Sequence, residues 1–588
     1  MNLARTLLLA VLFVSTVGIG RSHATSVIVP DDFATVQGAI DSGADSVLVR
    51  DGTYDEHVSI DHGLSLLAFD ASDPSDPSSL PRVKSLTFKP PALSGLATVR
   101  GMTSGGEVVL MNQLPGPELE VQMETCRLEA GIVQPSVIEA GALTVLGSMI
   151  LANVEVSCRR VELSQNDLNG AGIHATHVER GTYRSNDISA PPGVGINVNG
   201  DPDLEVERNT IKGATDGVLV TSPFGSLIRE NEIIDCSGTA IRTLEPPQPM
   251  PSHAPKTEFA LAPVPQGTSV VTIDQNTIQD CRGHGIDILS HGGVFVVEKN
   301  TIEKVGRSGI HATGWAYMHV HGNGVTGPGG PGVWLQMDAF GEGVGENRIL
   351  GGGADGMLLE AGTAAFRNVI GRCRGNGIRI FSGSAGGNTT YLNDGSGVSV
   401  GGESESHNNI GFGNLRFGLD VDPGQVAHLS CNDWFGNLAG PTGGIAPDPS
   451  DRFDHPLFCD LPNDNVYLSS ISPILDAPGC GLIGALGEGC NAPAGIPMVP
   501  AGARSLEASP RPARANVRFA WSPLAHPARL EVYDVAGALR WSAPLPAGAS
   551  RAEWTGTNRD GSRASAGLYY ARIVGGHERL ETRVVIVR

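Results

Sequence analysis

Aromatic residues, long apolar runs and positive charge are all scarce in this chain of 588 residues. Phe, Trp and Tyr make up 5% of it, and after the N-terminal segment no stretch approaches the roughly 18 apolar residues of a membrane-spanning helix. Lys and Arg number 41 against 62 Asp and Glu, a formal net charge of -21. An acidic surface repels phosphate backbones, so we expect no nucleic-acid partner. Because long apolar runs are lacking, we also expect no transmembrane segment in the mature chain.

Glycine, in contrast, is abundant, with 78 residues. A chain of this length exceeds one ordinary compact domain. Much glycine and few aromatics are typical of many short strands separated by turns, which predicts an all-β protein.

The N-terminus has the three parts of a signal peptide over residues 1–24. Arg5 supplies the positive charge, 7–14 is a short apolar run, and Ser22-His23-Ala24 is a small-x-small cleavage site. We therefore expect a mature chain that begins near Thr25 and is secreted, either extracellular or at the cell surface.

The central chain repeats itself at intervals of about 23 residues, a period that indicates a solenoid. One landmark is an Asn followed by a short β-patterned run, at Asn166, Asn186, Asn209, Asn231, Asn276, Asn300, Asn323, Asn347 and Asn368. A second is a Gly before an apolar residue, as in Gly285-Ile286 and Gly309-Ile310. Leucine-rich repeats share the period, but they need Leu and Asn in a regular pattern that this sequence does not have. We therefore predict about fifteen coils of parallel β-helix between roughly residues 45 and 430.

Two further predictions follow from the repeat. The Asn residues should stack at one corner as an amide ladder, with ordinary turn chemistry as the alternative. The glycines should serve turns where φ is positive. A 45-residue gap between Asn231 and Asn276 contains a Pro-rich stretch, which we interpret as a loop inserted over 245–268.

Seven of the nine cysteines fall into two kinds. Cys236, Cys281 and Cys373 each follow a repeat Asn by five residues, which predicts one inward position where a free thiol packs as a small hydrophobe. Four others lie in a loop-rich segment of a secreted chain, and we predict the local disulfides Cys431–Cys459 and Cys480–Cys490.

The mature N-terminus carries a family resemblance. Residues 33–41 and 45–54 resemble the capping helix and first strand of pectin-lyase-like right-handed parallel β-helix proteins. The resemblance covers roughly residues 26–490. It implies a right-handed parallel β-helix over 25–490 whose open end is covered by a helix, and it leaves the activity open among lyases, hydrolases, epimerases and non-enzymes.

The C-terminal end changes character. Residues 491–515 are rich in Ala and Pro, as linkers are, and 516–588 contain short alternating strands with a hairpin near 530–537. This last part resembles the Ig-like β-sandwich of flagellar hook-capping proteins and type IX secretion sorting domains. The resemblance implies a sorting role, with the secretion machinery as a partner.

Strand alternation places a row of polar side chains on the outside of adjoining coils, because the residue after each inward apolar position should face out. Arg242, Asp287, His311 and Trp334 should be consecutive members of this row. As catalytic candidates we name Asp287, His311, Arg242 and Arg379. As carbohydrate-binding candidates we name Trp315, Tyr317, Trp334 and His284, since flat aromatic faces suit sugar stacking. The alternative is that the aromatics pack against the inserted loop.

Other chemistry is less well supported. Gly283-His284-Gly285 and Asn376–Ile380 resemble motifs of pectin-hydrolysing glycosidases, but Phe381 replaces an expected Lys and no paired-Asp motif is present. His319 and His321 share a strand face and could hold a metal with Glu298, but solvated surface histidines explain this weak signal better, so we predict no cofactor. The sequence predicts a protein that binds, and in one version cleaves, an extracellular polysaccharide; a non-catalytic structural or adhesive stalk is the alternative.

Overall fold

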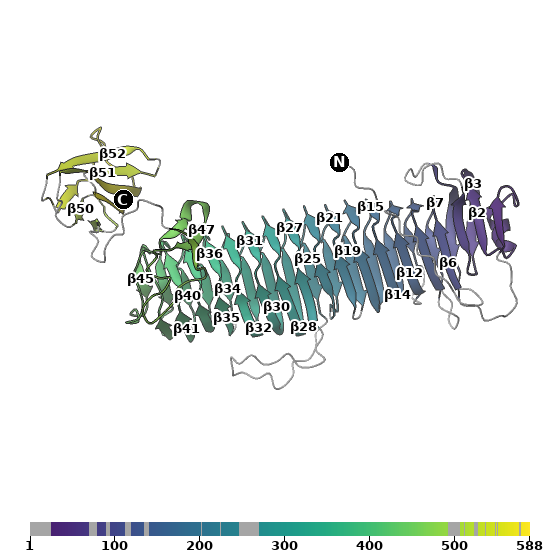
Figure 1. The fold of residues 1–588 in the computed structure, drawn as a ribbon, viewed down its shortest axis with the longest axis horizontal. Coiled ribbons are helices and arrows are strands. Elements are labelled where there is room, and N and C mark those ends of the chain that lie inside the picture. The colour runs from purple at the N-terminus through teal and green to yellow at the C-terminus, as the bar shows by residue number, and fades with distance from the viewer. Residues whose placement is uncertain are drawn as a thin grey trace. The chain divides into compact units, whose positions relative to one another are not determined.

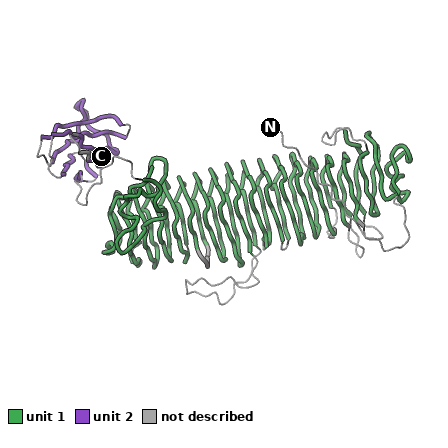
Figure 2. The backbone as a smooth tube through the Cα atoms, viewed as in Figure 1, with its two compact units in different colours: residues 1–491 green, residues 492–588 purple. Residues whose placement is uncertain are grey.

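A computed structural model describes residues 25–587, apart from 70–78, 90–94, 112–118, 135–139, 201–202, 224, 246–269, 361, 492–505, 511, 515, 522–526, 536, 547–548, 550 and 576–577. The predicted signal peptide, nearly all of the predicted insert and part of the linker lie outside the described residues. The chain forms two compact units, residues 1–491 and 492–588 (Figure 2). In the described part, no helix has the length and apolar character needed to cross a membrane.

The first unit begins with the predicted cap. Strand β1 (Ser26–Val29) pairs in parallel with β2 (Ser46–Arg50), and helix α1 (Val36–Asp41) lies between them in the chain. Thr35 caps the helix, because its side chain accepts a hydrogen bond from the backbone N–H of Gly38. Val36, Ala39 and Ile40 are buried, so the helix covers apolar core at this end.

Beyond the cap, the chain winds into a parallel β-helix of about 17 turns, somewhat more than the fifteen predicted (Figure 1). Each turn contributes strands to three parallel stacks. Stack A runs from β2 to β44 (Ala427–Ser430), stack B from β3 (Thr53–Ile60) to β45 (Gly440–Gly443), and stack C consists of shorter strands. The core is a continuous column of buried Val, Ile and Leu.

Earlier in the chain β14 (Val154–Ser164) belongs to two stacks at once, and three longer strands further along do the same. They are β28 (Ile286–Glu298), β30 (Ile310–His321) and β32 (Val333–Gly345). The first half of β28 pairs with β25 (Ile241–Leu244) of stack B, and its second half pairs with β26 (Val270–Asp274) of stack A. In β30 the backbone at Gly314 has φ 101°, a left-handed value that favours glycine. These strands therefore bend from one face of the helix to the next without a loop.

The predicted asparagine ladder is confirmed, and it is longer than the nine Asn residues identified from the repeat. After Asn166, each ladder Asn accepts, at Oδ1, hydrogen bonds from the backbone N–H and the Nδ2 of the Asn one coil before, all at 2.9–3.1 Å. The ladder comprises Asn166, Asn186, Asn209, Asn231, Asn276, Asn300, Asn323, Asn347, Asn368, Asn388, Asn409 and Asn432, and it ends on Asp451. It fixes the corner between stacks A and C.

The role predicted for the glycines is confirmed at turns, where Gly213 and Gly327 have positive φ, but it is wrong for the landmark glycines. Gly285, Gly309 and Gly332 do not have positive φ; a Cβ on any of them would lie 2.6–2.7 Å from a carbonyl oxygen of the next coil. They allow the coils to approach closely. Positive φ falls instead on the residue before each ladder Asn, such as Arg208 and Glu230, where the side chain points to solvent and no glycine is required.

The cysteine predictions are confirmed for the core and wrong for the pairing. Cys236, Cys281 and Cys373 are buried free thiols. The disulfides, however, are Cys431–Cys480 and Cys459–Cys490, with Cα separations of 5.5 and 5.9 Å.

The reason for the different pairing is that the chain folds back after the last coil. Ile474, Ala477 and Ile483 pack against residues of the helix wall, and Asn408 donates to the carbonyl oxygens of Cys480 and Leu482. Cys480 is thereby brought to Cys431 at the last ladder corner. Proximity in sequence could not reveal this return of the chain.

The second unit contains two antiparallel sheets around one small core. One sheet consists of β49 (Glu507–Ser509), β50 (Val517–Ala520) and β53 (Arg551–Trp554) in that order, and the other has the order β52–β51–β54–β55. The predicted hairpin is present as β51 (Ala528–Asp534) and β52 (Leu539–Leu545), and the strands β54 (Gly567–Gly575) and β55 (Glu578–Ile586) complete this sheet. The Ig-like fold of this unit remains a prediction.

Candidate functional site

The predicted row of outward residues exists with the predicted neighbours. In stack B, Arg242 of β25 lies opposite Asp287 of β28, which lies opposite His311 of β30, which lies opposite Trp334 of β32. We call these four residues the polar row. All four are partly exposed, while the residues on either side of each in its strand are buried or turn inward. Because parallel strands lie about 4.8 Å apart, successive members are in contact.

Ionic contacts join the first three residues of the polar row, Arg242, Asp287 and His311. Arg242 donates to Asp216 Oδ2 at 2.9 Å and has Asp287 Oδ2 3.4 Å from its Nε. Asp287 Oδ1 lies 2.8 Å from His311 Nδ1. Burial alone would raise the pKa of Asp287, but the hydrogen bond with His311 and the charges of His284, His311 and Arg242 outweigh it and lower that pKa. Asp287 is therefore an ionised carboxylate that orients His311.

His284 lies two residues before β28 and joins the polar row through His311. Its ring stacks on that of His311 with centroids 4.6 Å apart and an interplanar angle of 16°. The residue is 7% exposed, and burial lowers its pKa from 6.5 to about 4, so it is neutral at physiological pH. On either side, a Cβ at Gly283 or Gly285 would lie 2.6 Å from backbone of a neighbouring coil. Close packing thus accounts for the Gly-His-Gly fragment without a catalytic motif.

Trp334 closes the other end of the row. Its ring is tilted by 48° against His311 at a centroid distance of 4.7 Å, and its Nε1 donates to Glu360 Oε1 at 3.0 Å. The indole is held from one side and by its edge. It remains partly exposed, as expected for a residue that offers an apolar face to a ligand.

Two groups of side chains in the described residues have ligand atoms close enough to bind one metal ion. The first is His284, Asp287 and His311. An imidazole binds metal in the plane of its ring, and the two nearly parallel rings, 4.6 Å apart, cannot both contain one ion in their planes. This group fits a hydrogen-bonded pair better than a metal centre. The second group, Glu298, His319 and His321, is considered below.

The structure does not bring all the predicted site residues together. Tyr317 lies beyond the bend of β30, in the half that pairs with stack A. Arg379 is separated from Trp334 by Leu358 and lies 3.7 Å from Asp422, with its guanidinium over the Phe381 ring. The side chain of Trp315 lies outside the described residues. The polar row with His284 is therefore the part of the predicted site that forms one cluster.

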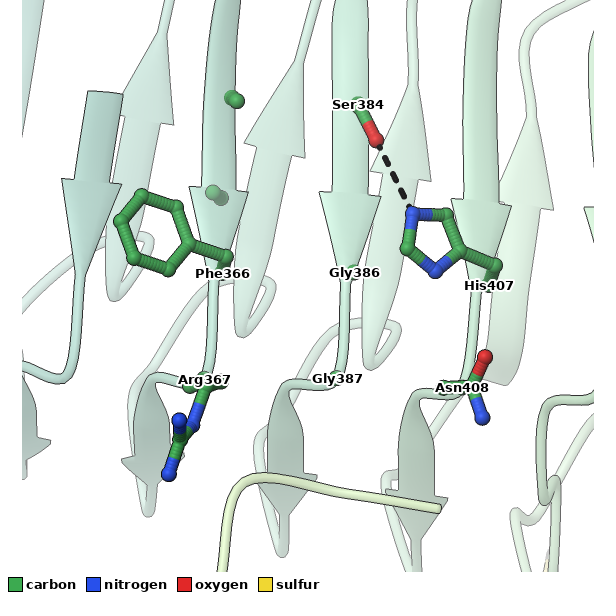
Figure 3. Close-up of a pocket in the computed structure, with 9 residues that line it drawn as sticks. Phe366, Arg367, Ser384, Gly386, Gly387, His407 and Asn408 are labelled. Atoms are coloured by element: carbon green, nitrogen blue, oxygen red, sulfur yellow. Dashed lines mark hydrogen bonds between the residues drawn. The ribbon is translucent and has the colours of Figure 1, made fainter. Parts of the chain in front are cut away.

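Sequence reasoning missed two polar partners and one hollow. Asp216 and Glu360 contact the polar row across coils, at offsets that the repeat does not mark. The hollow, about 450 Å³ in volume, lies on stack A between Phe366 and His407, over the small residues Ala364 and Gly386 (Figure 3). A column of small residues in the outward register was the signal that could have found it.

Comparison with known proteins identifies the fold. The family model described as a right handed beta helix region matches residues 147–245 and 265–395. This match confirms the right-handed parallel β-helix that the repeat and the resemblance predict. The search of curated proteins found no significant match.

The solved structures that the chain is similar to at low identity include the following three. Dimeric latent PorU from Porphyromonas gingivalis is 19% identical over 14% of this chain and 9% of that chain, with a TM-score of 0.13. The catalytic unit of a thermostable GH87 alpha-1,3-glucanase from Streptomyces thermodiastaticus strain HF3-3 is 12% identical over 75% of this chain and 72% of that chain, with a TM-score of 0.29. Tailspike protein 3 of bacteriophage CBA120 is 12% identical over 70% of this chain and 59% of that chain, with a TM-score of 0.24. Likenesses this distant support no inference about activity.

Proposed function

We propose that this protein is a secreted or cell-surface β-helix that binds an extracellular polysaccharide along the polar row. The observation that supports the proposal is the contact series Arg242–Asp287–His311–Trp334 on consecutive strands. It combines an aromatic face with ionised and hydrogen-bonding groups on a rigid wall. Sugars need both kinds of contact, stacking on their apolar faces and hydrogen bonds to their hydroxyls.

Binding is better supported than cleavage. A lyase needs a base and a cation that neutralises the uronate of the substrate, but Arg242 already contacts two carboxylates and Arg379 is close to Asp422. His311 Nε2 is the group that a base would use, and it is buried without a hydrogen-bond partner among the described residues. Cleavage would therefore require Trp334 or His284 to move and uncover this nitrogen.

Export is part of the same proposal. Residues 1–24 would be removed as a signal peptide, and the second unit would act as a sorting or attachment module of Ig-like fold. Two disulfides at the end of the helix fit an oxidising, extracellular compartment. The alternative is a non-catalytic structural or adhesive stalk, favoured by the unbroken ladder from Asn166 to Asn432.

A polysaccharide array with product analysis tests the proposal. Trp334→Ala and Asp287→Asn should each weaken binding to any glycan that the parent protein retains. For Trp334→Ala, which removes one stacked ring, the loss of affinity should be about tenfold. Phe453→Ala, at a side chain that is 50% exposed elsewhere on the helix unit, is the matched control and should bind normally. Retention of no glycan by the parent, or equal binding by all variants, would contradict the proposal and favour the stalk. If the parent protein releases sugar products and Asp287→Asn does not, the protein also cleaves the polysaccharide.

A further inference from the structure

Two histidines at the end of β30 share one face of stack A, at a distance from the polar row. His319 and His321 are partly exposed, and Val320 between them is fully buried. Residues i and i+2 of a strand lie roughly 6.6 Å apart, a spacing from which two imidazoles can reach one point. Their ring centroids are 5.2 Å apart.

Carboxylates approach this pair from the coil before and the coil after. Glu298 of β28 lies directly opposite His321, and the ligand atoms of Glu298, His319 and His321 are all within 4.8 Å of one another. Glu346, which follows β32, has its Oε2 3.4 Å from His321 Nε2. Four potential ligands of two kinds thus come from three successive coils.

The outer side of each carboxylate is held by a cation. Lys299 Nζ lies 3.3 Å from Glu298 Oε1, and an Arg367 guanidinium nitrogen lies 3.6 Å from Glu346 Oε1. For Glu346, the other oxygen is the one that faces the histidine. Contacts of this kind orient ligating carboxylates and typically accompany metal sites.

The coil that follows presents glycines to the histidines, and the Phe366 ring of the coil after it lies over the second glycine, where a Cβ on Gly345 would come within 2.2 Å of the ring. Because the pairing of β30 with β32 shifts register after Tyr317, His319 and His321 lie opposite Gly343 and Gly345. Neither glycine has a side chain that would cover the imidazoles. The Phe366 ring, at a centroid distance of 6.2 Å from His321, is the next bulky neighbour in this column.

We propose that Glu298, His319, His321 and Glu346 form a binding site for a divalent transition metal of the zinc class. Two imidazole nitrogens with carboxylate oxygens are a typical zinc donor set, whereas calcium prefers oxygen alone. The imidazoles are inclined by 19°, and each must rotate about its side-chain bonds so that the ion lies in both ring planes. These side chains are partly exposed and can do so without a change of the backbone, unlike the packed pair His284 and His311.

The test uses untagged full-length protein freed of metal by chelation. Titration calorimetry with ZnCl₂ should show one ion per chain, and Co²⁺ should give the visible absorption of a tetrahedral site. His319→Ala and His321→Ala should each weaken Zn²⁺ binding at least tenfold, and the double variant should abolish it. His428→Ala, at an exposed histidine of β44, is the matched control and should bind as the parent does.

Thermal unfolding without metal keeps the test interpretable. It should be the same in the parent and the double variant, because neither imidazole contributes to the core. The proposal is overturned if the parent protein takes up no Zn²⁺, if the double variant binds as well as the parent, or if His311→Ala abolishes binding while His319→Ala does not. That last result would place the ion at the polar row.

Discussion

The asparagine ladder allows a quantitative prediction about stability, and Asn276 is its most informative member. This side chain is fully buried and takes part in four hydrogen bonds. Its Oδ1 accepts from the backbone N–H and the Nδ2 of Asn231, and its Nδ2 donates to the carbonyl oxygen of Ile228 and to Asn300 Oδ1, all at 2.9–3.1 Å. Asn276→Ala removes all four.

The magnitude follows from what is left unpaired. A typical intramolecular hydrogen bond contributes about 1 kcal/mol net, and a buried group without a partner costs about 1–3 kcal/mol. The substitution leaves the backbone N–H of Asn231 without its acceptor in the core. We therefore expect the free energy of unfolding to fall by about 4 kcal/mol. Asn463→Ala, at an exposed residue whose amide donates to Asp460, should change it by less than about 0.5 kcal/mol.

A second substitution separates hydrogen bonding from loss of volume. Asn276→Asp keeps the shape and the acceptor for Asn231, but it places a carboxylate against the carbonyl oxygen of Ile228 and Asn300 Oδ1. Burial and these oxygens raise the pKa of the new carboxyl group, so the destabilisation should shrink as pH falls and the group gains a proton to donate.

Urea unfolding monitored by circular dichroism, with the disulfides intact, measures all three variants. Hydrogen exchange at the Asn231 amide shows whether the ladder opens locally before the whole helix unfolds. A loss below about 1 kcal/mol for Asn276→Ala, or an Asp variant whose deficit does not depend on pH, would refute the reasoning.

Three further predictions concern other parts of the helix unit. Replacing Cys431 and Cys480 by Ala opens a 49-residue loop and should cost about 4 kcal/mol in the loop-entropy treatment, seen as a lower urea midpoint; no change would show that the returning chain is held by packing alone. The pKa of His284 in the folded protein is about 4, below its ordinary 6.5, so its contribution to the free energy of unfolding is complete above pH 6.5 and should fall by up to about 3 kcal/mol as pH falls to 4. His284→Leu should remove that part of the pH dependence of stability, and an unchanged dependence would contradict the prediction. Gly309→Ala would place a Cβ 2.5 Å from Val325 and should lower the thermal midpoint by several degrees, whereas Gly193→Ala, with open space at that point, should not; equal midpoints would refute the close-packing role.

The features predicted correctly from the sequence are those repeated in every coil. Asn209 and Asn231 occupy the same position in successive coils and bind each other, so one period predicts both the ladder and the register of the polar row. Asp287 and His311 could be called adjacent for the same reason, because a parallel in-register stack turns equal offsets in sequence into contact.

Features that occur once in the chain were not accessible in this way. The bend at Gly314, which puts Tyr317 on a different stack from His311, depends on the φ of one residue. The pairing of Cys431 with Cys480 depends on how an irregular segment packs back onto the helix. Neither leaves a periodic signal, and alternation alone counted both halves of β30 as one face.

The repeat also explains why a binding surface can be rigid although it lies on the outside of the helix. Buried Asn side chains fix each coil at one corner, and glycines such as Gly285 and Gly309 let the next coil approach to contact at another. Between these two restraints, the Cα positions of Asp287, His311 and Trp334 cannot shift relative to one another without breaking buried hydrogen bonds. A ligand that fits the row therefore meets groups that are already ordered, and little conformational entropy is lost on binding. The same restraints act on His319 and His321, so at both surfaces adaptation to a ligand is confined to rotation of side chains.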